Sequence, residues 1–219
     1  MAVTLGGCSG NAEPQPDPPP DLQDRLDTAR QVLDDAESIE FTMSTDDLPS
    51  GVNGLLEAQG VGTHDPAFEG EVRVATTVGS LSADVVSVDG NVRAKIGFSP
   101  IYVPLDPGSY GAPDPAQLLD VESGVSSFLT ATDNIEGGDQ ARAGDEVLTT
   151  ISGTLPGSAV AAVIPSADDT GDFGVVYGLT DDDELRTAVL TGPFYPDADE
   201  VTYSLTLDPS AETVEITAP

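Results

Sequence analysis

Apolar residues recur at helical spacing near the start of the chain and then switch to the spacing of a strand. From residue 22 they follow one another at steps of four, three, four and three, as on one face of a helix: Leu22, Leu26, Ala29, Leu33 and Ala36. Asp21 directly precedes this run and is suited to cap the helix. Residues 39–44 then alternate between apolar and polar, which is typical of a half-buried strand. The pattern therefore predicts a capped amphipathic helix followed by a strand.

Residues 71–96 contain three strand-like runs, EVRVATTV, LSADVVSV and NVRAKI, joined by Gly79-Ser80 and Asp89-Gly90. Both dipeptides suit two-residue hairpin turns, and such turns make their flanking residues cross-strand partners on one face. Pairing Val78 with Leu81, and Val88 with Asn91, predicts one apolar face: Val72, Val74, Thr76, Val78, Leu81, Ala83, Val85, Ser87, Val92, Ala94 and Ile96. The other face is predicted to be polar, with Asp84 opposite Lys95, and exposes Val86 and Val88.

The rest of the chain predicts more strands and three short helical pieces. Strand-like runs occur at 146–152, 173–179, 185–190, 201–207 and 213–217. Two helical pieces are expected between Asp114 and Ala131, where Gly124 separates two apolar groups: Leu118 and Leu119 before it, and Val125, Phe128 and Leu129 after it. Residues 158–163 predict a third helix. We therefore predict an α+β fold in which residues 21–219 form a single domain, with one antiparallel sheet whose apolar face is covered by helices.

Charge narrows the list of partners. The chain has 39 acidic and 7 basic residues, a formal net charge of −32. Nucleic acid is therefore excluded as a partner, because binding its backbone requires clustered Lys and Arg. An anionic membrane surface would also repel this protein. No run of 18 apolar residues is present, so no membrane-spanning segment is predicted.

Cys8 is the only cysteine, which excludes an internal disulfide and a multi-cysteine metal site. Leu5-Gly6-Gly7-Cys8 looks like a bacterial lipobox, in which the cysteine is lipidated and becomes the new N-terminus. Residues 1–7 are then the remnant of a signal peptide, although they lack its basic start and apolar stretch. Residues 8–20 contain the lipidated cysteine and a proline-rich tether, which extends roughly 40 Å at about 3.1 Å per residue.

The sequence offers no catalytic or cofactor-binding pattern. His64, the only histidine, lies in GTHDP, which is typical of a solvated turn, and no nucleophile elbow or phosphate-binding loop is present. Aspartates at 168–172 and 181–183 could supply oxygen ligands to Ca²⁺, but their spacing fits no calcium-binding hand. We therefore expect neither an enzyme nor a protein that carries a cofactor or a metal.

Several segments resemble the actinobacterial LppX/LprA/LprF/LprG lipoproteins. They are ARQVLDDAESIEF, GEVRV, SADVVSVDGNVRAKI, DDDELRTAVLTGP, VEITAP and, most specifically, SYGAPDPAQLLDVESGVSSFL at 109–129. The resemblance covers residues 21–219. It implies a sheet curved into a half-open barrel whose concave face, roofed by helices, encloses an apolar cavity for acyl lipids or glycolipids. It also implies a lipid anchor on the extracytoplasmic face of the cell membrane, a role in carrying lipids within the envelope, and an envelope transporter as a candidate partner.

The predicted cavity lining combines the hairpin face with the two helical pieces: Val72, Val74, Val78, Leu81, Val85, Val92, Ile96, Leu118, Phe128 and Leu129. A second function class stays open, namely a surface scaffold or adaptor lipoprotein whose core is filled by side chains and binds no lipid. Both classes require the same apolar alternation. The small residues on the apolar face and an aromatic content of 5% favour the cavity.

Overall fold

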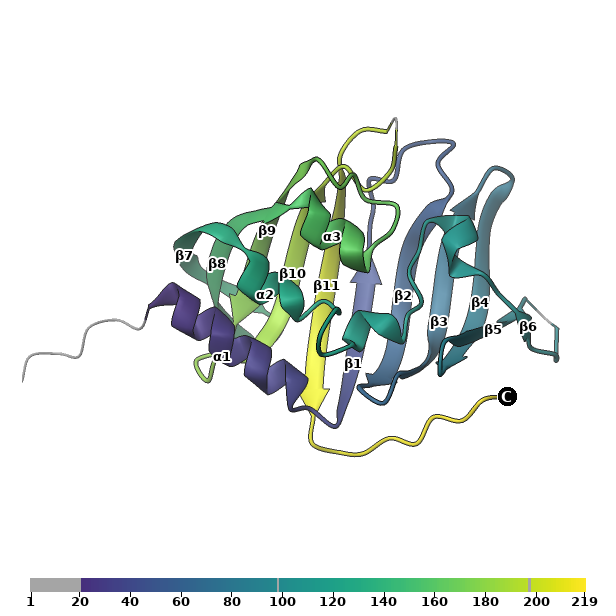
Figure 1. Cartoon of the computed structure of the whole chain (residues 1–219), viewed down its shortest axis with the longest axis horizontal. Helices are drawn as coiled ribbons and strands as arrows, with labels where there is room; N and C mark the ends of the chain where they lie inside the picture. The colour runs from purple at the N-terminus through teal and green to yellow at the C-terminus, as the bar shows by residue number, and fades with distance from the viewer. Residues whose placement is uncertain (1–20, 98, 197) are drawn as a thin grey trace, which may run out of the picture.

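An eleven-stranded antiparallel sheet forms the frame of the molecule (Figure 1). The computed structural model describes residues 21–97, 99–196 and 198–219. The strands are β1 (Ser38–Ser44), β2 (Gly54–Thr63), β3 (Ala67–Thr76), β4 (Gly79–Val88), β5 (Asn91–Ile96), β6 (Val103–Pro104), β7 (Asp133–Ala143), β8 (Glu146–Pro156), β9 (Asp172–Leu179), β10 (Leu185–Gly192) and β11 (Val201–Ser210). The sheet is curved and not closed, so the predicted fold class is confirmed.

The first and last strands lie side by side in the middle of the sheet. The order is β6-β5-β4-β3-β2-β1-β11-β10-β9-β8-β7, and Phe41 of β1 is the partner of Leu207 of β11. Each half of the sheet is a series of consecutive antiparallel strands, one from β1 outward to β6 and one from β7 inward to β11. The two edges are therefore β6 and β7, which follow one another in the chain.

The segment between the two edge strands crosses the concave face and forms a roof (Figure 1). We call residues 105–132 the roof; they include the 3₁₀ turns η1 (Pro107–Tyr110) and η2 (Gln117–Leu119) and the helix α2 (Ser127–Ala131). Helices α1 (Leu22–Asp34) and α3 (Gly157–Val163) lie on the same side of the sheet. The interior of the protein is the space between this layer and the concave face.

Helix α1 forms as the sequence predicts. The Asp21 carboxylate accepts a hydrogen bond from the backbone N–H of Gln23 at 3.0 Å, which satisfies one free donor of the first turn. Leu26, Ala29 and Leu33 are buried against the rest of the core. The amphipathic spacing thus places one stripe of the helix on the interior.

The β3–β4 hairpin differs from the prediction in register but not in face. Its turn is Thr77-Val78 instead of Gly79-Ser80, and the Thr76 hydroxyl donates to the Gly79 carbonyl at 2.7 Å across it. Leu81 therefore pairs with Val74, four residues from the predicted Val78. A shift by an even number keeps every side chain on its face. Val78 is the exception, because it now lies in the turn and is 96% exposed.

The β4–β5 hairpin has the predicted register. Val88 pairs with Asn91, and Asp84 pairs with Lys95, whose ammonium lies 2.8 Å from the Asp84 carboxylate. The predicted exposure of Val86 was wrong, since this side chain is only 4% exposed. The C-terminal segment reaches the outer face beside it: the partner of Val86, Arg93, donates to the Pro219 carbonyl at 2.9 Å.

Other elements were predicted with mixed success. The strands at 39–44, 146–152, 173–179, 185–190 and 201–207 and the third helix are confirmed. The two helical pieces expected between Asp114 and Ala131 are the short 3₁₀ turn η2 and the helix α2. The predicted strand at 213–217 was wrong, because the chain leaves the sheet after Ser210. Strands β2, β6 and β7 were missed.

Two phenylalanines pack over a glycine pair at the centre of the concave face. Gly60 of β2 pairs with both Phe41 of β1 and Gly70 of β3. The rings of Phe41 and Phe68 lie 5.4 Å apart, and a Cβ added at Gly70 would lie 2.5 Å from Phe68 Cζ. The missing side chains of Gly60 and Gly70 therefore create the space that the Phe68 ring fills.

Replacing this glycine tests the packing. We expect Gly70→Ala to lower the free energy of unfolding by about 1 to 3 kcal/mol, because the new methyl group meets both Phe68 and the backbone of β2. Urea unfolding measures the change. Gly174→Ala on β9 is the matched control, since its Cβ would have no neighbour nearer than 3.9 Å, and a change within about 0.5 kcal/mol is expected. Equal effects of the two substitutions would contradict this account of the packing.

Candidate functional site

The interior contains three adjoining apolar pockets between the sheet and the layer above it. The first, the valine pocket, lies over β1–β5 beneath the first half of the roof. Its walls are aliphatic apart from Phe41 and Tyr110. The lining residues are Phe41, Met43, Leu55, Ala58, Val72, Val74, Val85, Val92, Leu105, Pro107, Tyr110, Ala112, Pro113, Pro115 and Leu118.

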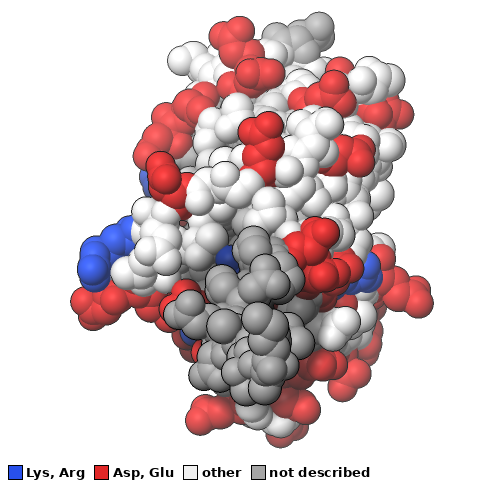
Figure 2. Space-filling view, turned by 90° about the vertical axis from the view of Figure 1, so that its left-hand side faces the viewer, with Lys and Arg blue, Asp and Glu red and all other residues white. Residues whose placement is uncertain are grey.

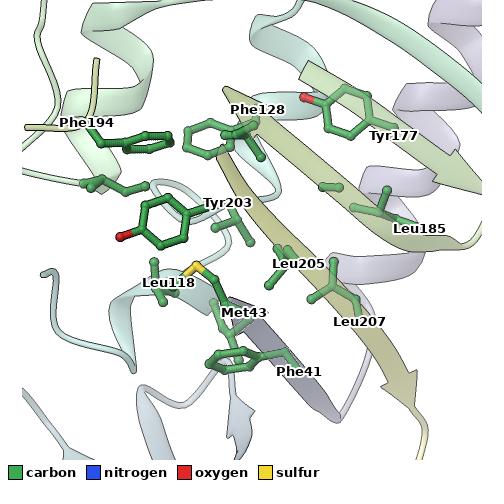
Figure 3. A pocket seen from close by; sticks show the side chains of 15 residues that line it. Phe41, Met43, Leu118, Phe128, Tyr177, Leu185, Phe194, Tyr203, Leu205 and Leu207 are labelled. Atoms are coloured by element: carbon green, nitrogen blue, oxygen red, sulfur yellow. The ribbon is translucent and has the colours of Figure 1, made fainter. Parts of the chain in front are cut away.

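The second, the aromatic pocket, lies over β1 and β9–β11 (Figure 3). Phe128 comes from α2, and Tyr177 and Tyr203 project from the sheet. The Phe194 ring lies edge-on to Tyr203, with centroids 5.0 Å apart. The lining residues are Phe41, Met43, Leu118, Leu119, Val125, Phe128, Ile164, Tyr177, Leu185, Ala188, Leu190, Phe194, Tyr203, Leu205 and Leu207.

The third, the seam pocket, lies where the roof meets the segment after α3. Gly111 to Pro113 form one of its sides and Ile164 another, and Met43 and Leu118 line it as well. The Ser166 hydroxyl donates to the Gly111 carbonyl at 2.7 Å, which joins the two segments at this point. The seam pocket therefore adjoins the other two below a hydrogen-bonded junction.

Side chains fill most of the interior. The cavity volumes are about 60 Å³ for the valine pocket, 40 Å³ for the aromatic pocket and 30 Å³ for the seam pocket. Pockets for drug-sized ligands usually measure about 300 to 1,000 Å³. A chain of methylene groups therefore fits only if the roof or the lining side chains move outward.

The polar atoms near the pockets are neutral and paired with one another. Tyr203 Oη donates to the Leu55 carbonyl at 2.8 Å and lies 2.7 Å from Tyr195 Oη, which in turn accepts from the Leu55 N–H. Tyr177 Oη lies 2.9 Å from the Thr132 hydroxyl. Burial raises the pKa of both Tyr177 and Tyr203 well above the ordinary tyrosine value. The pocket linings contain no charged side chain, so the interior suits an apolar ligand.

His64 joins the roof to helix α1. Its Nδ1 lies 2.6 Å from the Leu119 carbonyl oxygen in the roof, and its Nε2 lies 3.0 Å from the Leu33 carbonyl oxygen near the end of α1. Both carbonyl oxygens are acceptors, so each accepts a hydrogen bond from the facing ring nitrogen when that nitrogen carries a hydrogen. The predicted solvated turn residue is thus a partly buried structural clamp.

Further polar contacts hold the roof in place. The Ser87 hydroxyl on β4 donates to the Asp114 carboxylate at 2.6 Å, and Arg30 of α1 donates to the Val121 carbonyl at 3.2 Å. Within the roof, hydrogen bonds from the Ser123 hydroxyl and backbone N–H lower the pKa of Asp120 below its ordinary value. Besides these bonds, the roof packs on the interior through buried apolar side chains such as Leu119 and Leu129.

The structure brings six of the ten predicted lining residues to the pockets. Val72, Val74, Val85 and Val92 line the valine pocket, Phe128 lines the aromatic pocket, and Leu118 lines all three. Leu129 is fully buried in the core, and Ile96 packs against the core; neither lines one of these three pockets. Leu81 is half-buried away from the pockets, and Val78 lies in the exposed turn. Cys8 lies outside the described residues.

Sequence reasoning missed the middle of the site. Phe41 and Met43 were predicted only as strand residues, and the aromatic wall from Tyr177, Phe194 and Tyr203 was not predicted. The alternation on β1 shows that Phe41 and Met43 share a buried face. Their central position follows from the β1–β11 pairing, which joins residues far apart in the sequence.

Two larger hollows lie outside the interior and are lined by acidic groups. One, of about 560 Å³, lies over the outer side of β1–β3 and β11, and the other, of about 750 Å³, lies between the C-terminal segment and the loop that carries His64. Figure 2 shows acidic side chains spread over one end of the molecule, with few basic ones among them. These surfaces are unsuited to acyl chains and to anionic ligands.

Within the described ranges, no group of three or more His, Cys, Asp and Glu residues is arranged to hold a metal ion. No helix among the described residues is long and apolar enough to cross a bilayer.

Comparison with known proteins identifies the family. The profile of the LppX_LprAFG lipoprotein family matches residues 21–216. The chain belongs to this family. Two solved structures have the same fold. LprF from Mycobacterium bovis is 15% identical, with a TM-score of 0.70 over 90% of this chain and 96% of that one. The lipoprotein LppX from Mycobacterium tuberculosis is 16% identical, with a TM-score of 0.62 over 90% of this chain and 98% of that one.

Membership in a lipoprotein family implies an envelope-associated lipoprotein. At 15% and 16% identity, the two structures show the shared fold alone. No curated protein matches the chain.

The role of the histidine clamp can be measured. We expect His64→Ala to lower the free energy of unfolding by about 1 to 3 kcal/mol, because it leaves two partly buried carbonyls without donors. Thermal unfolding measures the loss, and Asp65→Ala, at the exposed neighbouring position, is the control and should change stability by no more than about 0.5 kcal/mol. A neutral His64→Ala substitution would contradict the clamp.

Proposed function

We propose that this protein is an extracytoplasmic lipoprotein that binds acyl lipids or glycolipids between the sheet and the roof and carries them within the cell envelope. The observation that carries this proposal is the interior itself. Three adjoining pockets without charged side chains lie beneath a layer made largely of turns and short helices. Family membership supports the same role.

Binding requires the roof or the lining side chains to move outward, because the pockets are too small for an acyl chain. The roof is suited to such movement, since separate hydrogen bonds hold it at a few points and apolar contacts hold it between them. An inserted chain replaces contacts among apolar side chains with contacts to methylene groups. Each methylene removed from water contributes about 0.8 kcal/mol, which favours the exchange.

Charge favours a neutral head group. The net charge of −32 repels anionic lipids, and like-charge juxtaposition is unfavourable at a binding surface. Sugar hydroxyls and glycerol esters carry no charge and can bond to carboxylates or backbone groups at the rim of the site. A glycolipid or another neutral acyl lipid is therefore the ligand class that we propose.

The proposed attachment to the membrane uses residues outside the described ranges. In the proposal Cys8 carries the lipid anchor, residues 8–20 act as a tether, and residues 21–219 form one lipid-binding domain on the extracytoplasmic face. Two or more acyl chains anchor a protein stably. The tether gives the domain a reach of roughly 40 Å, so that it can receive lipid from the membrane or from an envelope transporter.

The chemistry of the site supports a carrier and not an enzyme. The only histidine is engaged with two backbone carbonyls, and the tyrosines of the interior bond to one another or to neutral groups. None of these groups is arranged as a nucleophile beside a base. Binding and release are the activities that this interior supports.

Lipid binding should stabilise the purified protein. Protein prepared without detergent should yield acyl lipids on extraction with organic solvent, and added dioleoylglycerol should raise the melting temperature. At about one hundred times the Kd, the expected gain in unfolding free energy is about 2.7 kcal/mol. Glycerol without acyl chains is the control and should have no effect. If no lipid is extracted and no acyl lipid stabilises the protein, the scaffold with a filled core becomes the better account.

The anchor is tested separately from the interior. Expressed behind a complete signal peptide in a mycobacterial host, the protein should partition into membranes, and Cys8→Ser should release it. Ser9→Ala is the control and should leave partitioning unchanged. Mass spectrometry of the N-terminal peptide gives a direct readout: an unmodified Cys8 still preceded by residues 1–7 would rule out the lipid anchor.

A further inference from the structure

Three side chains separate the valine pocket from the aromatic pocket and line both. Phe41 and Met43 project from β1, in the middle of the sheet, and Leu118 projects from η2, in the middle of the roof. The two pockets share no other lining residue. We call these three residues the partition.

The partition has one rigid and one adaptable side. Phe41 is 4% exposed and its ring packs on Phe68, so its position is fixed by the core. Met43 is only half-buried, and methionine is unbranched and adjusts easily to different neighbours. Leu118 lies beside Met43 (Figure 3) and lines the same two pockets. The partition therefore consists of side chains that can stay between two ligand chains.

Each side of the partition has its own covering. Residues 105–115 of the roof cover the valine pocket, whereas residues 119–128 and Ile164 cover the aromatic pocket. Separate hydrogen bonds hold these parts: Ser87 holds Asp114 on one side, and His64 holds Leu119 on the other. The coverings of the two pockets are therefore held at different points.

The seam pocket lies directly over the partition. Met43 and Leu118 line it, together with Tyr195 and the Gly111–Pro113 segment. It adjoins both larger pockets and ends at the junction between Ser166 and Gly111. A ligand that branches at this point can send one chain to each side while its branch point faces the Tyr195 hydroxyl and backbone carbonyls.

We propose that Met43 and Leu118 are specificity-determining residues that select lipids with two acyl chains, one chain in the valine pocket and the other in the aromatic pocket. This inference rests on the proposed function, because it assigns the ligand class of the same interior. The competing arrangement is a single chain that displaces Met43 and runs through both pockets.

Filling one pocket at a time distinguishes the two arrangements. Val74→Trp obstructs only the valine pocket and Leu205→Trp only the aromatic pocket, and both positions are half-buried, which leaves room for a ring. Asp84→Trp on the outer face is the control. The chain has no tryptophan of its own, so each variant also carries a single fluorescent reporter. The probes are dioleoylglycerol and monooleoylglycerol, each supplied in phosphatidylcholine vesicles and measured as lipid that co-elutes with the protein.

Each pocket-filling variant should bind dioleoylglycerol about tenfold less tightly or worse, since losing the burial of even two methylenes costs that much. Monooleoylglycerol binding should change by less than about twofold, because the other pocket still accepts a chain. Equal losses of both probes in both variants would overturn the two-chain assignment while leaving lipid binding intact.

Removing the partition gives the complementary result. Met43→Ala should reduce the preference for dioleoylglycerol over monooleoylglycerol by about tenfold, since one chain can then cross into the second pocket. An unchanged preference would overturn the role of Met43.

If a tryptophan variant melts below the assay temperature, Val74→Phe and Leu205→Phe replace it with a smaller ring. Wild-type protein that binds neither probe would overturn the proposed function itself, and the inference with it.

Discussion

The crossing of residues 105–132 over the concave face is the constraint on which the rest of the structure depends. The two halves of the sheet meet at the β1–β11 pair, so the consecutive strands β6 and β7 lie at opposite edges. Ten strand spacings of about 4.8 Å make a path of roughly 48 Å along the sheet. The connection that spans it carries Leu118, Leu119, Phe128 and Leu129, all of which are buried beneath it. One segment therefore connects the strands and creates the interior.

The two edge strands of the open sheet are poorly suited to pairing with another sheet. Strand β6 has two residues and ends in a proline, and β7 is exposed along nearly all its length and interrupted by two register shifts. Short, irregular and charged edges discourage pairing with another sheet. On the outer face, Arg73 pairs with Glu57, and Arg186 is surrounded by three carboxylates. Most charged side chains thus lie on the outside, while the linings of the three pockets contain none.

Local patterns predicted the parts of the fold whose partners are close in sequence. The apolar face of the β3–β4 hairpin was predicted correctly despite a four-residue error in register, because a shift by an even number of residues leaves each side chain on the same face of the sheet. Strand β2 was missed because Gly60 and Gly62 interrupt its alternation, and β7 because an edge strand with two exposed faces has no apolar period. His64 resembles a turn residue in sequence, since its partners Leu33 and Leu119 are 31 and 55 residues away. The partition could not be predicted for the same reason: the residues near Met43 in sequence do not indicate that β1 lies at the centre of the sheet.

The most direct test of the central claim is a crystal structure of the protein with a neutral diacyl lipid whose chains carry bromine. The anomalous signal locates each chain independently of the protein density. The account predicts bromine peaks between the sheet and residues 105–132, one on each side of Met43, with the roof displaced outward relative to the structure described above. Peaks confined to the outer acidic hollows, or an unmoved roof above an interior without bromine, would contradict it.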